Sequence, residues 1–238
     1  MTESDMEDGR TARERMRAER DAAARRARLR KRGLITATVV TAAALVTAYF
    51  TTRAPEDEAA GKPLIVPANT AGQDRTWVAY GKSDARNTLT VRTALDCPAC
   101  QKAEEALGPA MRALADQGTY RIEYQVTPAP DGDTSKASRH AINALAAAAN
   151  ADAGKFTRYL SLLLAEDTRS FSDDGLLKLA EKTEGLRSPA FDKAVRERTC
   201  LPWVDKVTGA APPSSAGRPD LPTIELDGTR LSLHEPGR

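Results

Sequence analysis

The stretch Thr88–Asp116 decides the fold: it reads TLTVRTAL (88–95), Asp96, CPAC (97–100) and QKAEEALGPAMRALAD (101–116). The first part is typical of a β-strand, and the apolar spacing after it predicts an amphipathic helix over 98–116. We expect one face of that helix to carry its apolar residues, namely Ala103, Ala106, Leu107, Ala110, Met111 and Leu114. The two cysteines therefore lie at the junction of a strand and a helix.

The pair Cys97 and Cys100 lies in the first turn of this predicted helix. Two intervening residues there bring the sulfurs close enough to form a disulfide, and Pro98 suits a first turn because its missing N–H would have no partner. Free N–H groups and the positive end of the helix dipole stabilise a thiolate on Cys97. We therefore predict that Cys97 is the nucleophile and that Cys100 resolves the mixed disulfide. Asp96 would oppose thiolate formation by like-charge repulsion if it lies close.

Two other interpretations of the cysteine pair stay open at this point. A purely structural disulfide across so short a loop would stabilise the chain little. A zinc half-site would need a second CxxC or paired histidines, and Cys200, His140 and His234 offer no such spacing. The sequence therefore predicts neither a metal nor another cofactor. We expect Cys200 to be buried, His140 to be a partnered or surface residue of a helix, and His234 to be exposed.

Strands and helices alternate through the rest of the body. Strands are predicted over 77–80, 120–126, 223–226 and 229–233, and helices over 135–150, 155–166, 173–183, 188–199 and 202–207. Asp227-Gly228 is a strong signal for a two-residue hairpin turn. This order predicts an α/β fold with a mixed sheet in one domain, residues 76–238, with a helical insertion over about 135–208. Before it, we expect a linker over 53–75 in which Leu64–Val66 forms a short edge strand.

The net charge of +2 is divided unevenly along the chain. Residues 1–32 carry +4 and the remainder carries −2, so the predicted folded part is slightly acidic. A nucleic-acid-binding domain concentrates basic charge on its folded part, and we therefore expect no nucleic-acid partner. Three cysteines are also too few for a scaffold held together by disulfides.

An uncharged segment of 20 residues, Gly33–Thr52, follows the basic tail. Its length suits a membrane-spanning helix. Six of the eight residues 25–32 before it are basic, and three acidic residues, 56–58, follow it. The positive-inside rule predicts a single anchor at 33–52 in the cell membrane, a cytoplasmic tail at 1–32 and an extracytoplasmic domain. The alternative is a cleaved signal peptide, which would need an unusually long region before its apolar segment. The tail either contacts anionic lipid head groups or only sets the topology.

A second feature, Leu221-Pro222-Thr223, directly precedes the last predicted hairpin. A proline at the start of a strand near a sheet centre is unusual unless its peptide is cis or it faces a site. CPAC at a strand–helix junction, the helical insertion and LPTIELDG near the C-terminus together resemble the thioredoxin fold. The insertion (RHAINALAAAANADAGKFTRYLSLLLAED) and VRERTCLPWVDKV most resemble disulfide-bond oxidoreductases of the DsbA kind. The resemblance covers about 77–233.

This resemblance implies roles for residues outside the cysteine pair. Pro222 would be a cis-proline facing the CxxC motif, with Leu221 presenting its backbone to the substrate and Thr223 beside it. Pro98 and Ala99 would tune the redox potential and contact the substrate, although the family often has an aromatic residue or His where Ala99 stands. The chain ends at 238, so we expect no closing helix and a sheet face that is partly open or covered by the linker.

Taken with the predicted anchor, the resemblance implies a membrane-anchored, extracytoplasmic thiol–disulfide oxidoreductase. It would exchange the Cys97–Cys100 disulfide with cysteines of exported proteins, as an oxidase rather than a reductase, and a redox partner would recycle it. The alternative is a non-catalytic thioredoxin-like module that binds proteins outside the membrane; Ala99, Asp96 and the missing helix motivate it. A copper or zinc delivery protein would need a suitable histidine, which the sequence lacks.

Overall fold

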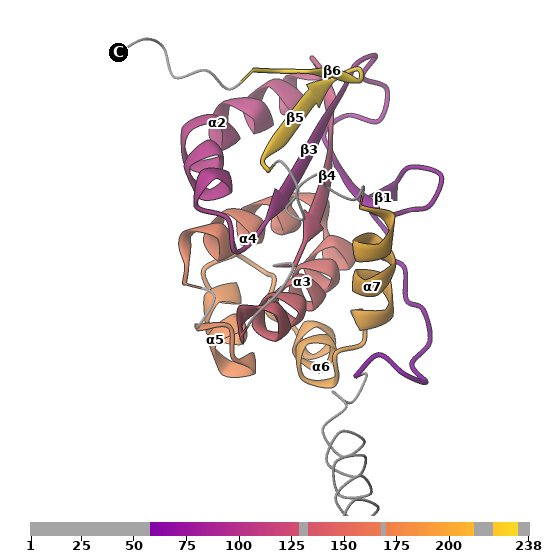
Figure 1. Cartoon of the computed structure of the whole chain (residues 1–238), viewed down its shortest axis with the longest axis vertical. Coiled ribbons are helices and arrows are strands. Elements are labelled where there is room, and N and C mark those ends of the chain that lie inside the picture. Colours follow the sequence, from indigo (N-terminus) through magenta and orange to yellow (C-terminus); the bar gives the residue numbers. More distant parts are fainter. Residues whose placement is uncertain (1–57, 129–132, 168–169, 212–220, 233–238) are drawn as a thin grey trace, which may run out of the picture. The chain divides into compact units, whose positions relative to one another are not determined.

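A strand–helix–strand crossover forms the centre of the sheet (Figure 1). The computed structural model describes four stretches of the chain: residues 58–128, 133–167, 170–211 and 221–232. Within them, β3 (Thr88–Ala94) and β4 (Arg121–Thr127) pair in parallel, and α2 (Pro98–Gln117) connects them. Two parallel strands cannot be joined by a tight turn, so the chain between them must cross over the sheet.

Four further strands complete a six-stranded sheet with the order β1-β2-β4-β3-β5-β6, and all of their pairings are antiparallel. They are β1 (Thr70–Ala71), β2 (Trp77–Tyr80), β5 (Thr223–Leu226) and β6 (Thr229–Arg230). Asp227 and Gly228 have φ angles of 49° and 79°, which makes the β5–β6 connection a two-residue turn with positive φ at both positions. The predicted mixed sheet and hairpin are confirmed, although β6 is shorter than expected.

The two faces of the sheet differ because side chains alternate along each strand. One face is apolar and buried; it includes Val78, Leu89, Val91, Ile122, Tyr124 and Ile224. On the other face, the Arg92 guanidinium lies 5.0 Å from the centroid of the Trp77 ring, 3.3 Å from Gln125 Oε1 and 3.7 Å from Glu225 Oε1. Polar side chains on this second face therefore interact with one another across neighbouring strands. No helix follows β6 as far as Ser232, the last residue described.

The buried face of α2 is not the one that the apolar spacing predicted. The helix buries Cys100, Gly108, Met111 and Ala115, whereas Ala106 and Ala110 are exposed and Leu107 and Leu114 are 37% and 39% exposed. The physical reason is that the inward face must carry Cys100, and the residue one turn further along that face is the polar Glu104. The expected grouping of Ala106, Leu107, Ala110 and Leu114 as a packed face is therefore wrong, and only Met111 of that set is fully buried.

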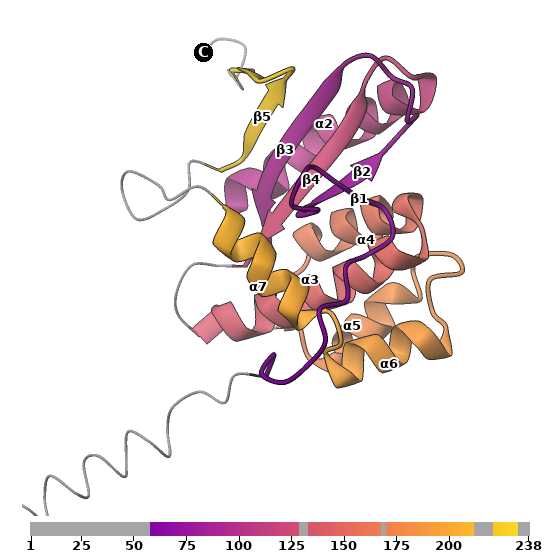
Figure 2. The same cartoon turned by 90° about the vertical axis from the view of Figure 1, so that its right-hand side faces the viewer.

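Five helices lie between β4 and β5 in the sequence. They are α3 (Asp133–Ala151), α4 (Ala153–Ala165), α5 (Asp173–Ala180), α6 (Pro189–Glu197) and α7 (Leu201–Ala210). Helix α3 packs against the other four, and Figures 1 and 2 show the five helices grouped together. The large apolar residues of α4, among them Phe156, Leu160 and Leu163, are buried, and the Tyr159 hydroxyl donates to the carbonyl of Leu176 at 2.9 Å. All five helices that the patterns predicted are thus present.

The segment 58–69 runs beside the helical group on its way to β1 (Figure 2). The Ala68 N–H donates to Asn150 Oδ1 at 3.1 Å, and Asn69 Nδ2 donates to the Ala149 carbonyl at 2.8 Å, so the segment is bonded to the end of α3. The edge strand expected at 64–66 is wrong, because the structure forms it at β1 instead. Prolines on both sides of 64–66 lack the N–H that a ladder needs, and Leu64 is 51% exposed.

Glu58, the first residue described, joins this segment to the helical group through ion pairs. Its carboxylate lies 2.6 Å from Lys136 Nζ and 2.6 Å from His140 Nε2, and 3.3 Å from Arg198 Nε. Burial alone would raise the pKa of Glu58, but the hydrogen bonds from Lys136 and His140 outweigh it and lower the pKa to about 2. The charged form of Glu58 therefore stabilises the folded chain.

Among the residues that the structure describes, none belongs to a helix with the length and hydrophobicity needed to cross a membrane. The expected anchor at 33–52 and the tail at 1–32 lie outside the described residues.

The substitution Glu58→Gln should lower the free energy of unfolding at neutral pH by about 1 kcal/mol, because it removes the charge from a partly exposed ion-pair cluster. Folding lowers the pKa of Glu58 from 4.5 to about 2, so its contribution is complete above 4.5 and is lost as the pH falls toward 2. Urea unfolding of the full chain in non-ionic detergent, followed by circular dichroism, should show the difference between wild type and variant shrinking over that range.

The matched control is Glu184→Gln, since Glu184 is exposed and no ion pair joins it to another described residue. This variant should unfold like the wild type at every pH. A Glu58→Gln difference that stays constant from neutral pH down to the acid limit would show that the cluster does not stabilise the fold through its charge.

Candidate functional site

The cysteines of the CPAC motif form a disulfide at the N-terminus of α2, with their sulfurs 2.06 Å apart. Cys97 is the N-cap residue of the helix and Pro98 lies in its first turn. The N–H of Cys100 points at Cys97 Sγ from 3.1 Å. The free N–H groups and the dipole of a helix N-terminus favour negative charge, so reduction would leave Cys97 where a thiolate is stabilised.

The two sulfurs differ in how accessible they are. Cys100 is 2% exposed, whereas Cys97 is half-buried and its neighbours Pro98 and Ala99 are exposed. A thiol that approaches from solution can therefore reach Cys97 and not Cys100. This geometry is what the predicted roles of nucleophile and resolving thiol require, and the roles themselves remain predictions.

The segment before β5 lies against the disulfide, 124 residues after it in the sequence. The Leu221–Pro222 peptide is cis, as the resemblance implied. The Leu221 carbonyl oxygen is 3.9 Å from Cys97 Sγ, and Pro222 lines a small void together with Cys100. Thr223 is the next residue and begins β5. The structure thus places both expected segments in one site.

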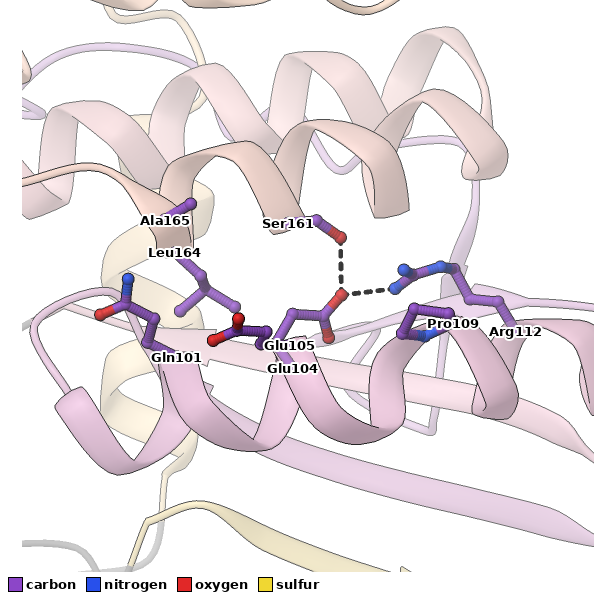
Figure 3. Close-up of a pocket in the computed structure, with 8 residues that line it drawn as sticks. All are labelled: Gln101, Glu104, Glu105, Pro109, Arg112, Ser161, Leu164 and Ala165. Carbon is purple, nitrogen blue, oxygen red and sulfur yellow. Dashed lines mark hydrogen bonds and ion pairs between the residues drawn. The ribbon is translucent and has the colours of Figure 1, made fainter.

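A groove of about 360 Å³ lies between α2 and α4, next to the disulfide. Figure 3 shows its lining residues: Gln101, Glu104, Glu105, Pro109 and Arg112 on α2, and Ser161, Leu164 and Ala165 on α4. The first of them, Gln101, donates its N–H to the Cys97 carbonyl at 3.0 Å. The groove therefore begins one helical turn away from the accessible sulfur.

A nearly buried ion pair on α2, between Glu104 and Arg112, is bonded to the α4 wall of the groove through Ser161. Glu104 Oε1 accepts hydrogen bonds from Arg112 Nη1 and, at 2.6 Å, from Ser161 Oγ, and only 10% of the Glu104 side chain is exposed (Figure 3). Burial alone would lower the pKa of Arg112, but the hydrogen bond and the charge of Glu104 raise it, so the guanidinium stays charged. The apolar spacing over 98–116 did not predict this pair. One signal in the sequence could have indicated it. Glu104 follows Cys100 by four residues and Arg112 follows Glu104 by eight, and residues at such spacings lie near one another on one side of a helix.

A void of about 10 Å³ lies between the disulfide and the groove. Glu104 and Leu164 line both the void and the groove, and Cys100 and Tyr124 also line the void. Tyr124 is 1% exposed, its hydroxyl has no hydrogen-bond partner among the described residues, and burial raises its pKa. Only a thin layer of side chains therefore separates the buried sulfur from the groove.

Other residues that the sequence singled out take no part in the disulfide. Cys200 is a free thiol, 3% exposed; its N–H donates to Asn143 Oδ1 at 2.8 Å and burial raises the pKa of its thiol, which confirms the expected buried position. His140 is partnered as expected, and Asp96 is exposed directly before the disulfide. His234 lies outside the described residues. Across the described ranges, no three His, Cys, Asp or Glu side chains are grouped as a metal site would require.

Solved structures with the same fold include DsbA, MdbA and BdbD from three bacteria. DsbA from Mycobacterium tuberculosis, in its reduced form, is 18% identical with a TM-score of 0.55, and the match covers 67% of this chain and 86% of that one. The MdbA protein of Actinomyces oris, a thiol-disulfide oxidoreductase, is 15% identical with a TM-score of 0.56 over 71% of this chain and 82% of its own. Oxidised BdbD from Bacillus subtilis is 17% identical with a TM-score of 0.54, and the match covers 71% of this chain and 90% of that one. At such identities the likeness concerns the fold alone.

Sequence comparison gives the family. Among curated proteins, none matches this chain. A family model described as thioredoxin does match, over residues 73–236. Since this match runs from just before β2 to beyond β6, it contains the disulfide, the cis-proline and nearly the whole sheet, and the chain belongs to the thioredoxin family.

Proposed function

We propose that this chain is a thiol–disulfide oxidoreductase that exchanges its Cys97–Cys100 disulfide with cysteines of other proteins. The observation that carries the proposal is the unequal access of the two sulfurs: Cys97 is reachable at a helix N-terminus and Cys100 is 2% exposed behind it. Family membership and the names of the structures with the same fold, DsbA, MdbA and BdbD, support it.

The exchange takes place in two steps. A substrate thiolate attacks Cys97 Sγ, a new disulfide joins substrate and Cys97, and Cys100 leaves as a thiolate that takes up a proton. A second substrate thiolate then attacks the substrate sulfur of this mixed disulfide and releases Cys97 as a thiolate, which the N-terminus of α2 stabilises. The substrate loses two electrons and gains a disulfide, and the chain becomes a dithiol. The Leu221 carbonyl oxygen, 3.9 Å from Cys97 Sγ, supports a role for the Leu221 backbone in holding the substrate.

We propose further that the reaction runs as an oxidation, on exported proteins, outside the cell membrane. The uncharged segment 33–52, with basic residues before it and acidic residues after it, supports an anchor with the domain on the extracytoplasmic side. Disulfides persist in that compartment, which suits an oxidase. The direction also requires a partner that oxidises the dithiol again after each turnover.

The Cys100→Ser variant should accumulate mixed disulfides with exported proteins in cells. Its Cys97 thiolate can attack a disulfide of an exported protein, and the Cys100 thiol that would release the substrate from that bond is gone. Non-reducing electrophoresis should show high-mass adducts that a reductant releases, and mass spectrometry should place the bond on Cys97. The Cys97→Ser variant is the control: it keeps Cys200 and Cys100 but should form few adducts. Equal and low adduct levels in both variants would favour a non-catalytic protein-binding module instead.

Cysteines introduced on either side of segment 33–52 should differ in their reaction with a membrane-impermeant maleimide. In a Cys97→Ser, Cys100→Ser background, Glu184→Cys in the exposed part of the domain should be labelled in intact cells. The Ser4→Cys variant in the basic tail should be labelled only after the cells are permeabilised. Labelling of both positions in intact cells, or of neither, would refute the proposed topology. It would not bear on the disulfide exchange, which the Cys100→Ser experiment tests.

A further inference from the structure

The groove between α2 and α4 has the shape and charge of a docking site for part of the substrate chain. Resting on the function proposed above, we propose that it binds a substrate segment that carries a Lys or Arg three or four residues from the reactive cysteine. The groove would thereby favour basic segments next to the cysteines whose thiolates attack the disulfide.

The groove lies within reach of the reacting sulfur. It begins at Gln101, whose N–H is bonded to the Cys97 carbonyl at 3.0 Å, and continues along α2 to Arg112. Glu105 is eight positions after Cys97, which is about 12 Å along a helix that rises 1.5 Å per residue. An extended chain advances roughly 3.3–3.6 Å per residue and covers this distance in three or four residues.

The charge of the groove is negative where a substrate side chain would arrive. Glu105 is exposed and no ion pair joins it to another described residue. Arg112 does not compensate for it, because Arg112 is already paired with Glu104. The C-terminal end of α4, at Leu164 and Ala165, adds the partial negative charge of its last carbonyl groups.

The walls beside this charge are apolar, which suits a basic side chain in particular. Pro109, Leu164 and Ala165 line the groove, and Leu164 lies beside Glu105 (Figure 3). Lys and Arg side chains bury their aliphatic stems against apolar surface while the charged end stays in a polar setting. A bound Lys or Arg would thus pack its stem on Leu164 and place its cation at Glu105. A bound Glu would meet repulsion there.

A one-step reaction tests this without depending on the direction of electron flow. The reduced full chain carrying Cys100→Ser, in non-ionic detergent, reacts with single-cysteine peptides whose sulfur is blocked as a 2-thiopyridyl disulfide. The Cys97 thiolate attacks the peptide sulfur and a new disulfide joins the two. Pyridine-2-thiolate leaves, takes up a proton from solvent and is measured by absorbance as pyridine-2-thione. Cys200 is buried and does not contribute. Three peptides differ only in having Arg, Gln or Glu four residues away on both sides of the cysteine.

The Arg peptide should react fastest and the Glu peptide slowest, with roughly a two- to fivefold step between neighbouring peptides as for a partly exposed ion pair. High salt should reduce this preference. Glu105→Gln should remove most of it and Glu105→Lys should reverse the order. The control Glu184→Gln, which alters an exposed carboxylate elsewhere, should keep the wild-type order and rates.

Equal rates for the three peptides, or an unchanged preference in Glu105→Gln, would overturn the docking proposal while leaving the oxidoreductase in place. A preference that Glu184→Gln removes as fully as Glu105→Gln would also overturn it, because the effect would then come from overall charge. Failure of even the Gln peptide to react would refute the proposed function, and the docking proposal with it.

Discussion

The pairing of β5 with β3 is the constraint on which the site depends. Thr223 pairs with Arg92, so the residues just before β5 fall beside the end of β3, where the chain turns into α2. This register brings the Leu221 carbonyl to 3.9 Å from the accessible sulfur, across 124 residues of sequence. A slip of one residue would turn every side chain of β5 to the opposite face. The same register that buries Ile224 in the core therefore also sets Pro222 against the disulfide.

The inserted helices give the disulfide its surroundings. Helix α4 supplies the second wall of the groove, and its Ser161 bonds to the Glu104 carboxylate of α2. A buried carboxylate is unfavourable unless it is paired and hydrogen-bonded. The Ser161 hydrogen bond and the ion pair with Arg112 supply these interactions, so the Glu104 carboxylate can lie close to Cys100. The helical group also binds the segment 58–69.

Features set by neighbouring residues could be predicted from the sequence, and features set by distant partners could not. The turn at 227–228 and the close approach of Cys97 and Cys100 at the start of α2 each involve only a few adjacent residues. Both were predicted correctly. The inward face of α2 was not, because Leu107 is exposed while Glu104 is nearly buried. Besides Arg112 on its own helix, Glu104 bonds to Ser161, 57 residues later, and no local pattern shows that second contact. Pro222 was placed at the site by resemblance, since strand pairing across the inserted helices has no local signal.

The reduction potential of the Cys97–Cys100 couple tests the central claim most directly. The full chain would be equilibrated in glutathione buffers of graded potential, and the fraction with the disulfide intact would be measured by alkylation and mass spectrometry. If the helix N-terminus stabilises the Cys97 thiolate strongly enough for an oxidase, the potential should lie near about −120 mV. A value near about −270 mV would identify a reductase and contradict the account.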